Sequence, residues 1–218
     1  LGVSLEGTNL YGATLEKVNL SNATLKGANL KDATLREGAN LSRATLDGAF
    51  LPLATLDGVG LSHATLEGAT LFRATLRGAI LNHATLDGAD LRGAVLDGAY
   101  LWGAELNGAS LHGAELNGAA LWLAKLNDAT LIYAELNEAV FRGARLNDAD
   151  LRGAELRRAT FAGSSLCGAD FTTSVVDCGA VIYDNNVDRT TDFRGVALES
   201  ATIPPRELGQ LQSCCRRL

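Results

Sequence analysis

An apolar residue stands at every fifth position along most of this 218-residue chain. The series runs in steps of five from Leu5 to Leu35, makes one step of six to Leu41, and continues in fives to Val181. Ala stands two residues before 29 of the 36 centres, and Gly is frequent two residues after them. Five centres are not Leu, and all five are apolar: Phe141, Phe161, Phe171, Val176 and Val181. Such strict repetition predicts a repeat architecture.

A period of five fits neither regular element. An α-helix turns about 100° per residue, so five residues overshoot a full turn by about 140° and would scatter the centres over every face. A straight strand alternates its faces with period two, so an odd step would send successive centres to opposite sides. The chain must therefore turn a corner in each repeat. Ala and the centre then point inward from a short extended piece, and Gly is tolerated at the corner.

This pattern resembles the pentapeptide-repeat family, whose motif is A-(D/N)-L-x-x. The stretches 89–93 and 149–153 both read Ala-Asp-Leu-Arg-Gly and match the motif fully, and the resemblance covers roughly residues 2–183. It implies an all-β fold, a right-handed quadrilateral parallel β-helix with four repeats per coil. The 36 repeats would then make about nine coils. With stacked strands about 4.8 Å apart, the rod would be roughly 43 Å long.

The pattern divides the chain into three segments. Residues 1–183 are predicted to form the solenoid, with a one-residue insertion near 36–38 that we interpret as a bulged corner. Residues 184–204 are predicted to form a loop and a partial final coil, because the five-step returns there for three more centres. These centres are Phe193, Leu198 and Ile203. Residues 205–218 are predicted to form a short helix that begins with Pro205 and caps the exposed core of the last coil.

A 20-residue coil converts the sequence into a surface map, because residues 20 apart become stacked neighbours. One face carries both tryptophans of the chain, and Trp102 and Trp122 are expected to stack in adjacent coils. The candidate interaction patch on this face consists of Ile80, Tyr100, Trp102, Trp122, Leu123 and Val140. Exposed apolar surface with Trp and Tyr is typical of interfaces, and homodimerisation is its simplest use. The alternative is a ladder of side chains that only stiffens the stack.

A second candidate surface is acidic. Glu115, Glu135 and Glu155 are 20 apart and are expected to form a ladder on another face. The alternative interpretation is a solvated face that keeps the rod soluble. On a third face, Glu105 and Lys125 are expected to form an exposed ion pair.

The sequence contains no recognisable set of catalytic or metal-binding residues. His63 and His83 should stack, but Zn²⁺ requires three or four ligands, and the next residue in their column is Arg43. No nucleophile has a base in a concave pocket, and no phosphate-loop motif occurs. We therefore expect no enzymatic activity, no cofactor and no metal. The four cysteines have no metal-ligand spacing and are predicted to be reduced thiols: Cys167, Cys178, Cys214 and Cys215.

The net charge and the length of the apolar runs argue against two further classes of function. The net charge of −6 and the lack of a basic patch argue against direct nucleic-acid binding, and no apolar run is long enough for a membrane-spanning helix. The chain starts in mid-pattern and contains no Met, so we interpret it as part of a longer protein, for which a membrane-anchored signalling protein and a secreted effector are the open alternatives. The expected reduced thiols favour a cytoplasmic location in a bacterium.

The expected function is that of a structural scaffold whose outer faces bind a protein partner. The resemblance implies one alternative, a DNA mimic that inhibits or protects DNA gyrase, as in quinolone-resistance pentapeptide proteins.

Overall fold

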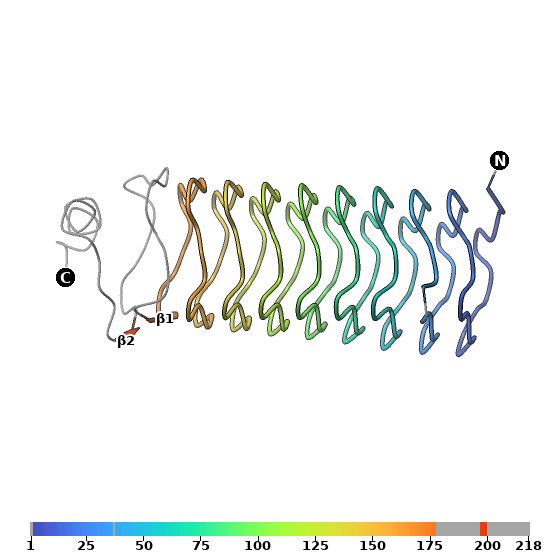
Figure 1. Cartoon of the computed structure of the whole chain (residues 1–218), viewed down its shortest axis with the longest axis horizontal. Helices are drawn as coiled ribbons and strands as arrows, with labels where there is room; N and C mark the ends of the chain where they lie inside the picture. The colour runs from blue at the N-terminus through green and yellow to red at the C-terminus, as the bar shows by residue number, and fades with distance from the viewer. Residues whose placement is uncertain (1, 37, 178–196, 200–218) are drawn as a thin grey trace.

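The computed structural model describes residues 2–36, 38–177 and 197–199, which form a rod of stacked coils (Figure 1). Nearly all pairing consists of single parallel bridges between neighbouring coils, such as those of Ile80 with Tyr100 and Tyr100 with Ala120. The two strands, β1 (Val175–Asp177) and β2 (Ala197–Glu199), also pair in parallel. The described part of the chain is therefore a parallel β-helix, as predicted, whose extended pieces are mostly too short to form strands.

Most repeats turn their corner through the same backbone hydrogen bonds. The Leu61 amide donates to the Ile80 carbonyl of the next coil at 2.8 Å, and the Ala64 amide closes the turn on the Leu61 carbonyl at 3.0 Å. His63, the third residue of this turn, has a φ of 58°, a conformation that Gly adopts most easily. Turns recur every five residues and bridges every 20, so four corners complete a coil.

The Asp or Asn of the repeat caps an amide that the backbone leaves without a carbonyl partner. In one arrangement the residue before the centre does so, as where Asp90 Oδ1 accepts the Arg92 amide at 3.2 Å. In the other, the acceptor lies in the preceding coil: Asp97 Oδ1 accepts the Asn117 amide at 2.9 Å, and Asn117 Oδ1 accepts the Asn137 amide at 3.1 Å. Side chains that bond to nearby backbone amides favour turns. The first arrangement accounts for the Asp or Asn before the centre in the motif, whereas Asp97 and Asn117 stand after their centres, at a variable position.

The interior is filled by the centres and the small residues before them, which are buried from residue 23 to residue 176. Near the C-terminal end the rings of Phe141 and Phe161 stack with centroids 4.7 Å apart, and Phe161 meets Phe171 edge-on at 5.8 Å. Ser164 replaces Ala there, and its hydroxyl donates to the Phe161 carbonyl at 2.6 Å. The core is therefore aliphatic along most of the rod and includes contacting phenylalanine rings among the aliphatic centres of its last described coils.

One corner absorbs the inserted residue near 36–38. Thr14 pairs with Thr34, 20 positions later, whereas Asn19 pairs with Asn40, 21 positions later. From Asn40 onward the step is 20 again. The insertion therefore changes one corner and leaves the alignment of the faces intact.

β2 extends the stack beyond β1, with Leu198 in register with Val176. This pairing agrees with Leu198 as one of the additional centres. Phe193, Ile203 and the predicted capping helix 205–218 lie outside the described residues. In the part of the chain that the structure does describe, no helix has the length and apolar character needed to cross a bilayer.

Candidate functional site

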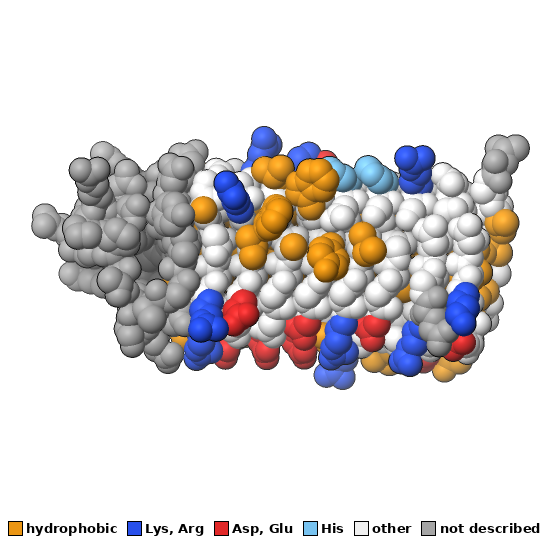
Figure 2. Space-filling view, in the orientation of Figure 1, with side chains coloured by type: hydrophobic (Ala, Val, Ile, Leu, Met, Phe, Trp, Pro, Cys, Tyr) orange, Lys and Arg blue, Asp and Glu red, His pale blue; other side chains and the backbone are white. Residues whose placement is uncertain are grey.

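The strongest candidate site is an apolar surface on one side of the rod, which we call the aromatic patch. Its members are those predicted from the sequence: Ile80, Tyr100, Trp102, Trp122, Leu123 and Val140. The first five side chains are between 40% and 56% exposed, and Val140 is partly buried. Figure 2 shows hydrophobic side chains gathered in the middle of one face, beside the histidines. The structure thus brings the six predicted residues onto one surface.

The repeat positions these side chains in two ways. Ile80 and Tyr100 stand before their centres and pair with each other across neighbouring coils. Trp102 and Trp122 stand after their centres, at the corners. The Trp102 amide donates to Oδ1 of Asn82 in the preceding coil at 3.1 Å, which fixes the start of that corner.

The two tryptophans lie in adjacent coils, where the Gly103 amide donates to the Trp122 carbonyl at 2.8 Å, but the observed ring contact of Trp102 is with another residue. Among the ring contacts of the described residues, Trp102 meets His83 edge-on, with centroids 4.7 Å apart, and no contact joins it to Trp122. His83 also stacks on His63 at 5.1 Å, as expected. His83 can reach the next coil because Gly103 has no side chain, and a Cβ there would lie 2.8 Å from His83 Nδ1. The Trp102 indole therefore contacts His83, a corner residue of the preceding coil, and not Trp122, the residue 20 positions later.

Sequence reasoning missed this packing of large corner side chains over glycine. A Cβ at Gly143 would lie 2.8 Å from Cδ2 of Leu123, and one at Gly153 would lie 2.4 Å from Cε1 of Tyr133. The signal was present in the sequence, because each of these glycines follows a bulky residue by 20 positions.

The acidic ladder forms as predicted, but amide and basic side chains contact it. Glu115, Glu135 and Glu155 pair in successive coils. Oε2 of Glu135 accepts a hydrogen bond from Nδ2 of Asn117 at 3.1 Å, and Oε2 of Glu155 accepts one from Nη1 of Arg157 at 2.7 Å. Part of the ladder's negative charge is therefore already compensated within the chain.

Ion pairs occupy other positions on the surface. Glu105 and Lys125 form the expected pair, with Oε1 and Nζ 2.5 Å apart. On the face opposite the aromatic patch, Arg92 binds Asp90 at 2.7 Å and Arg152 binds Asp150 at 2.6 Å.

The two arginines lower the pKa of both aspartates. Hydrogen bonds from the Arg92 side chain and amide lower the pKa of Asp90 below its ordinary value, although burial raises it. Burial is the largest influence on Asp150 and by itself raises its pKa, but the hydrogen bonds and charge of Arg152 together outweigh it and lower the pKa.

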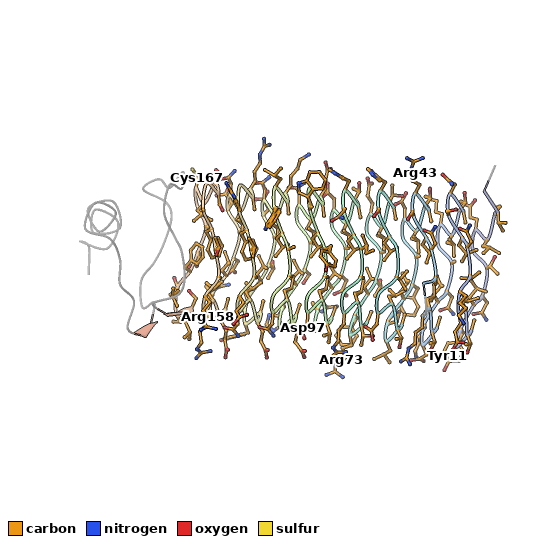
Figure 3. All side chains as sticks on the ribbon, viewed as in Figure 1. Tyr11, Arg43, Arg73, Asp97, Arg158 and Cys167 are labelled. Atoms are coloured by element: carbon orange, nitrogen blue, oxygen red, sulfur yellow. The ribbon has the colours of Figure 1, made fainter. Side chains whose placement is uncertain are left out.

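Figure 3 shows how side chains leave the rod: Arg43 and Cys167 lie along one edge, and Tyr11, Arg73 and Asp97 along the other. Among the described residues, no group of three or more His, Cys, Asp or Glu side chains converges as metal ligands would. His63 and His83 have an arginine, not a third ligand, as the next residue of their column. Cys178, Cys214 and Cys215 lie outside the described residues.

Comparison with protein families gives a match over most of the chain. The family model described as "Pentapeptide repeats" matches in eight copies, at residues 2–36, 37–71, 71–101, 94–131 and 134–172. No curated protein matches the chain.

Two solved structures illustrate the structural likeness. HetL, a pentapeptide repeat protein involved in heterocyst differentiation regulation in the cyanobacterium Nostoc sp. strain PCC 7120, is 30% identical, with a TM-score of 0.76 over 91% of this chain and 90% of HetL. A trypsin-treated variant of QnrB1, a plasmid-mediated fluoroquinolone resistance protein, is 19% identical, with a TM-score of 0.65 over 94% of each chain. At 19% identity, the likeness to QnrB1 concerns the fold alone.

Proposed function

The chain belongs to the pentapeptide-repeat family, and we propose that it acts as a non-catalytic scaffold that binds a protein partner through the aromatic patch. The carrying observation is the exposure of five large apolar side chains on one face, each 40% or more exposed. Contiguous apolar surface that contains Trp and Tyr is characteristic of binding sites. A rigid rod is suited to this role because its stacked coils hold the side chains at fixed spacing.

The packing of the patch favours an interface over a ladder that merely stiffens the stack. A stiffening ladder would place like rings on one another along the rod. Here His83 touches Trp102 edge-on, and both tryptophans keep about half of their surface exposed, at 47% and 50%. Much of the apolar area therefore remains available to a partner.

The alternative function, mimicry of DNA toward gyrase, depends on the acidic ladder. That ladder is short, the Asn117 side chain donates a hydrogen bond to Glu135, and Arg157 compensates the charge of Glu155. The likeness to QnrB1 does not bear on this role. A supercoiling assay with gyrase would decide the matter, because a DNA mimic must inhibit or protect the enzyme.

The test of the proposed function is a double charge substitution in the patch. We expect the full chain to retain a binding partner that Trp102→Glu/Trp122→Glu loses, because two buried carboxylates at an interface would lack compensation. The measurement is affinity capture with quantitative mass spectrometry, combined with light scattering to determine the mass of the protein in solution.

The matched control is Phe72→Glu/Tyr133→Glu, which makes the same charge change at exposed aromatic positions on the opposite face. It should leave capture unchanged. Circular dichroism must show that all variants fold. If the patch variant captures the same proteins as the parent and its mass is unchanged, the patch is not the binding surface.

A further inference from the structure

The face that carries the aromatic patch differs from the rest of the surface in charge. We call it the aromatic face and define it as the outward positions of the repeats centred on residues 20, 41, 61, 81, 101, 121, 141 and 161. These positions are the residue before each centre and the two residues after it. None of them, from Asn19 to Gly163, is Asp or Glu, although the chain has 25 acidic residues and a net charge of −6.

Each of the other three faces carries several carboxylates. Examples from the three faces in turn are Asp47, Glu67 and Asp87; Asp57, Asp97 and Glu115; and Asp90, Asp150 and Asp170. Because one face lacks acids entirely while its neighbours are rich in them, the aromatic face is the place where a negatively charged molecule meets least repulsion.

Basic and imidazole groups lie at both ends of the patch. Before it, Arg43, His63 and His83 occupy successive positions of one column, and the last of them contacts Trp102. After it, Arg142 follows Trp122 by 20 positions, and its carbonyl accepts the Leu123 amide at 3.0 Å. The apolar surface is therefore bracketed by arginines with no carboxylate of the same face beside them.

From this arrangement we propose that the partner is an acidic protein segment whose apolar side chains cover the tryptophans and whose carboxylates pair with Arg43 and Arg142. This inference rests on the proposed function and specifies the chemistry of the partner. The aromatic residues would supply most of the binding free energy, because desolvated Trp and Tyr dominate interfaces. The two arginines at the rim would contribute mainly selectivity and a faster association rate.

A second copy of the chain fits the aromatic face less well. In a two-fold dimer the same surface meets itself, so a face without acids would offer no carboxylate to its own arginines. This disfavours the homodimer that the exposed tryptophans first suggested.

Nucleic acid also fits less well. Arg43 and Arg142 are five coils apart, or about 24 Å at 4.8 Å per coil. One DNA strand carries a phosphate about every 3.4 Å along the helix axis. Most phosphates would therefore lack a cation, while the carboxylates of the neighbouring faces would repel them.

The experiment selects a phage-displayed random-peptide library on the full chain and removes the peptides that also bind Trp102→Glu/Trp122→Glu. We expect the remaining peptides to combine aromatic or aliphatic residues with an excess of Asp and Glu over Lys and Arg. Arg43→Glu/Arg142→Glu should weaken their binding by about tenfold or more, which corresponds to about 1.4 kcal/mol, and added salt should reduce the difference.

The control Arg73→Glu/Arg77→Glu makes the same charge change on two other faces and should leave binding within about twofold of the parent. If no peptide depends on the tryptophans, the proposed function itself fails. If the selected peptides depend on the tryptophans but are neutral or basic, the docking function stands and this inference is wrong.

Two further measurements would overturn the inference in favour of another occupant. One is binding of a fluorescein-labelled thymidine oligonucleotide or DNA duplex that Trp102→Glu/Trp122→Glu abolishes. The other is a dimer in light scattering that the same variant converts to a monomer. The expected result is that the chain binds neither oligonucleotide and is monomeric without its partner.

Discussion

Asp90 and Asp150 each accept hydrogen bonds from a backbone amide and from an arginine side chain. Oδ1 of Asp90 accepts the Arg92 amide at 3.2 Å and Nε of the same arginine at 2.8 Å, and Oδ1 of Asp150 accepts the corresponding groups of Arg152 at 3.1 and 2.8 Å. One residue therefore caps the corner and binds a cation. Asn in the same position, as at Asn40, provides the cap without the charge, with Oδ1 accepting the Ser42 amide at 2.9 Å.

We predict that Asp90→Asn/Asp150→Asn reduces the acid sensitivity of the rod. The folded protein lowers the pKa of both aspartates, so their ionised form stabilises it. This stabilisation is present above the pKa of an unfolded Asp, about 3.9, and is lost as the pH falls through the lower folded value. The difference in urea midpoint between parent and variant should therefore shrink as the pH falls from about 6 to about 3.

Asp97→Asn is the control for this prediction, because Oδ1 of Asp97 accepts the Asn117 amide, whereas Asp90 and Asp150 bind arginines. Its urea midpoint should follow the parent across the same range more closely than the double variant does. Parallel curves for the parent and the double variant would show that the two ion pairs contribute nothing to stability.

At the scale of single residues, the sequence predicted position better than contact. The step of 20 placed His63 beside His83 and Glu105 beside Lys125, and both pairs form. The same reasoning placed Trp102 and Trp122 in adjacent coils but did not predict that the Trp102 ring contacts His83. The spacing of 20 residues predicts which Cα atoms are neighbours in adjacent coils. It does not predict the direction of a bulky corner side chain, because that side chain tilts toward the neighbouring position where a glycine leaves space.

The corner is the structural element of this fold, and its glycines fall into two groups. Most have open space around them, so their role is the positive φ alone. Others lie under a large side chain of the preceding coil, as Gly153 lies under Tyr133 and Gly143 under Leu123. The sequence could predict the first group from the period, whereas the second requires comparison of residues 20 apart.

We predict that Gly153→Ala destabilises the rod more than Gly163→Ala. The two glycines have similar φ values, 67° and 69°, so the backbone strain of Ala should be similar in both. A Cβ at 153 would lie 2.4 Å from the Tyr133 ring, whereas one at 163 meets nothing within 4 Å. The additional loss should be about 1–3 kcal/mol in urea unfolding.

The pair Tyr133→Ala/Gly153→Ala should recover most of that additional loss, because the shortened side chain removes the clash. If Gly153→Ala and Gly163→Ala cost the same, the ring does not occupy the space above Gly153. Failure of the double variant to recover stability would point to the same conclusion.

For the whole molecule, the alignment of the faces depends on the number of residues per coil. The repeat predicted this stacking because an apolar residue at every fifth position is buried only by a chain that turns in each repeat. The sequence did not predict that the extended pieces reduce mostly to single bridges. The C-terminal capping helix remains a prediction.

We predict that deletion of residues 107–111, one repeat between the two tryptophans, preserves the fold but disrupts the aromatic patch. Trp122 would then follow Trp102 by three repeats instead of four and would lie on a neighbouring face. Far-UV circular dichroism per residue should be unchanged, whereas binding of the selected peptides should fall by about tenfold or more.

Deletion of residues 144–163 is the control, because it removes a complete coil beyond the patch and keeps the faces aligned. That variant should retain peptide binding. Equal binding by both deletion variants would mean that recognition does not require the two tryptophans on one face.

The inserted residue near 36–38 shows where the rod accepts extra chain. Its corner takes up one more residue, yet the bridges return to a step of 20 from Asn40 onward. A fluorophore-bearing loop or an affinity tag built into this turn would project sideways while the coils on either side keep their alignment. Trp102 and Trp122 lie three and four coils beyond the repeat that follows the insertion, so such a handle would leave the tryptophans accessible, but it should be short because Arg43 lies in that repeat.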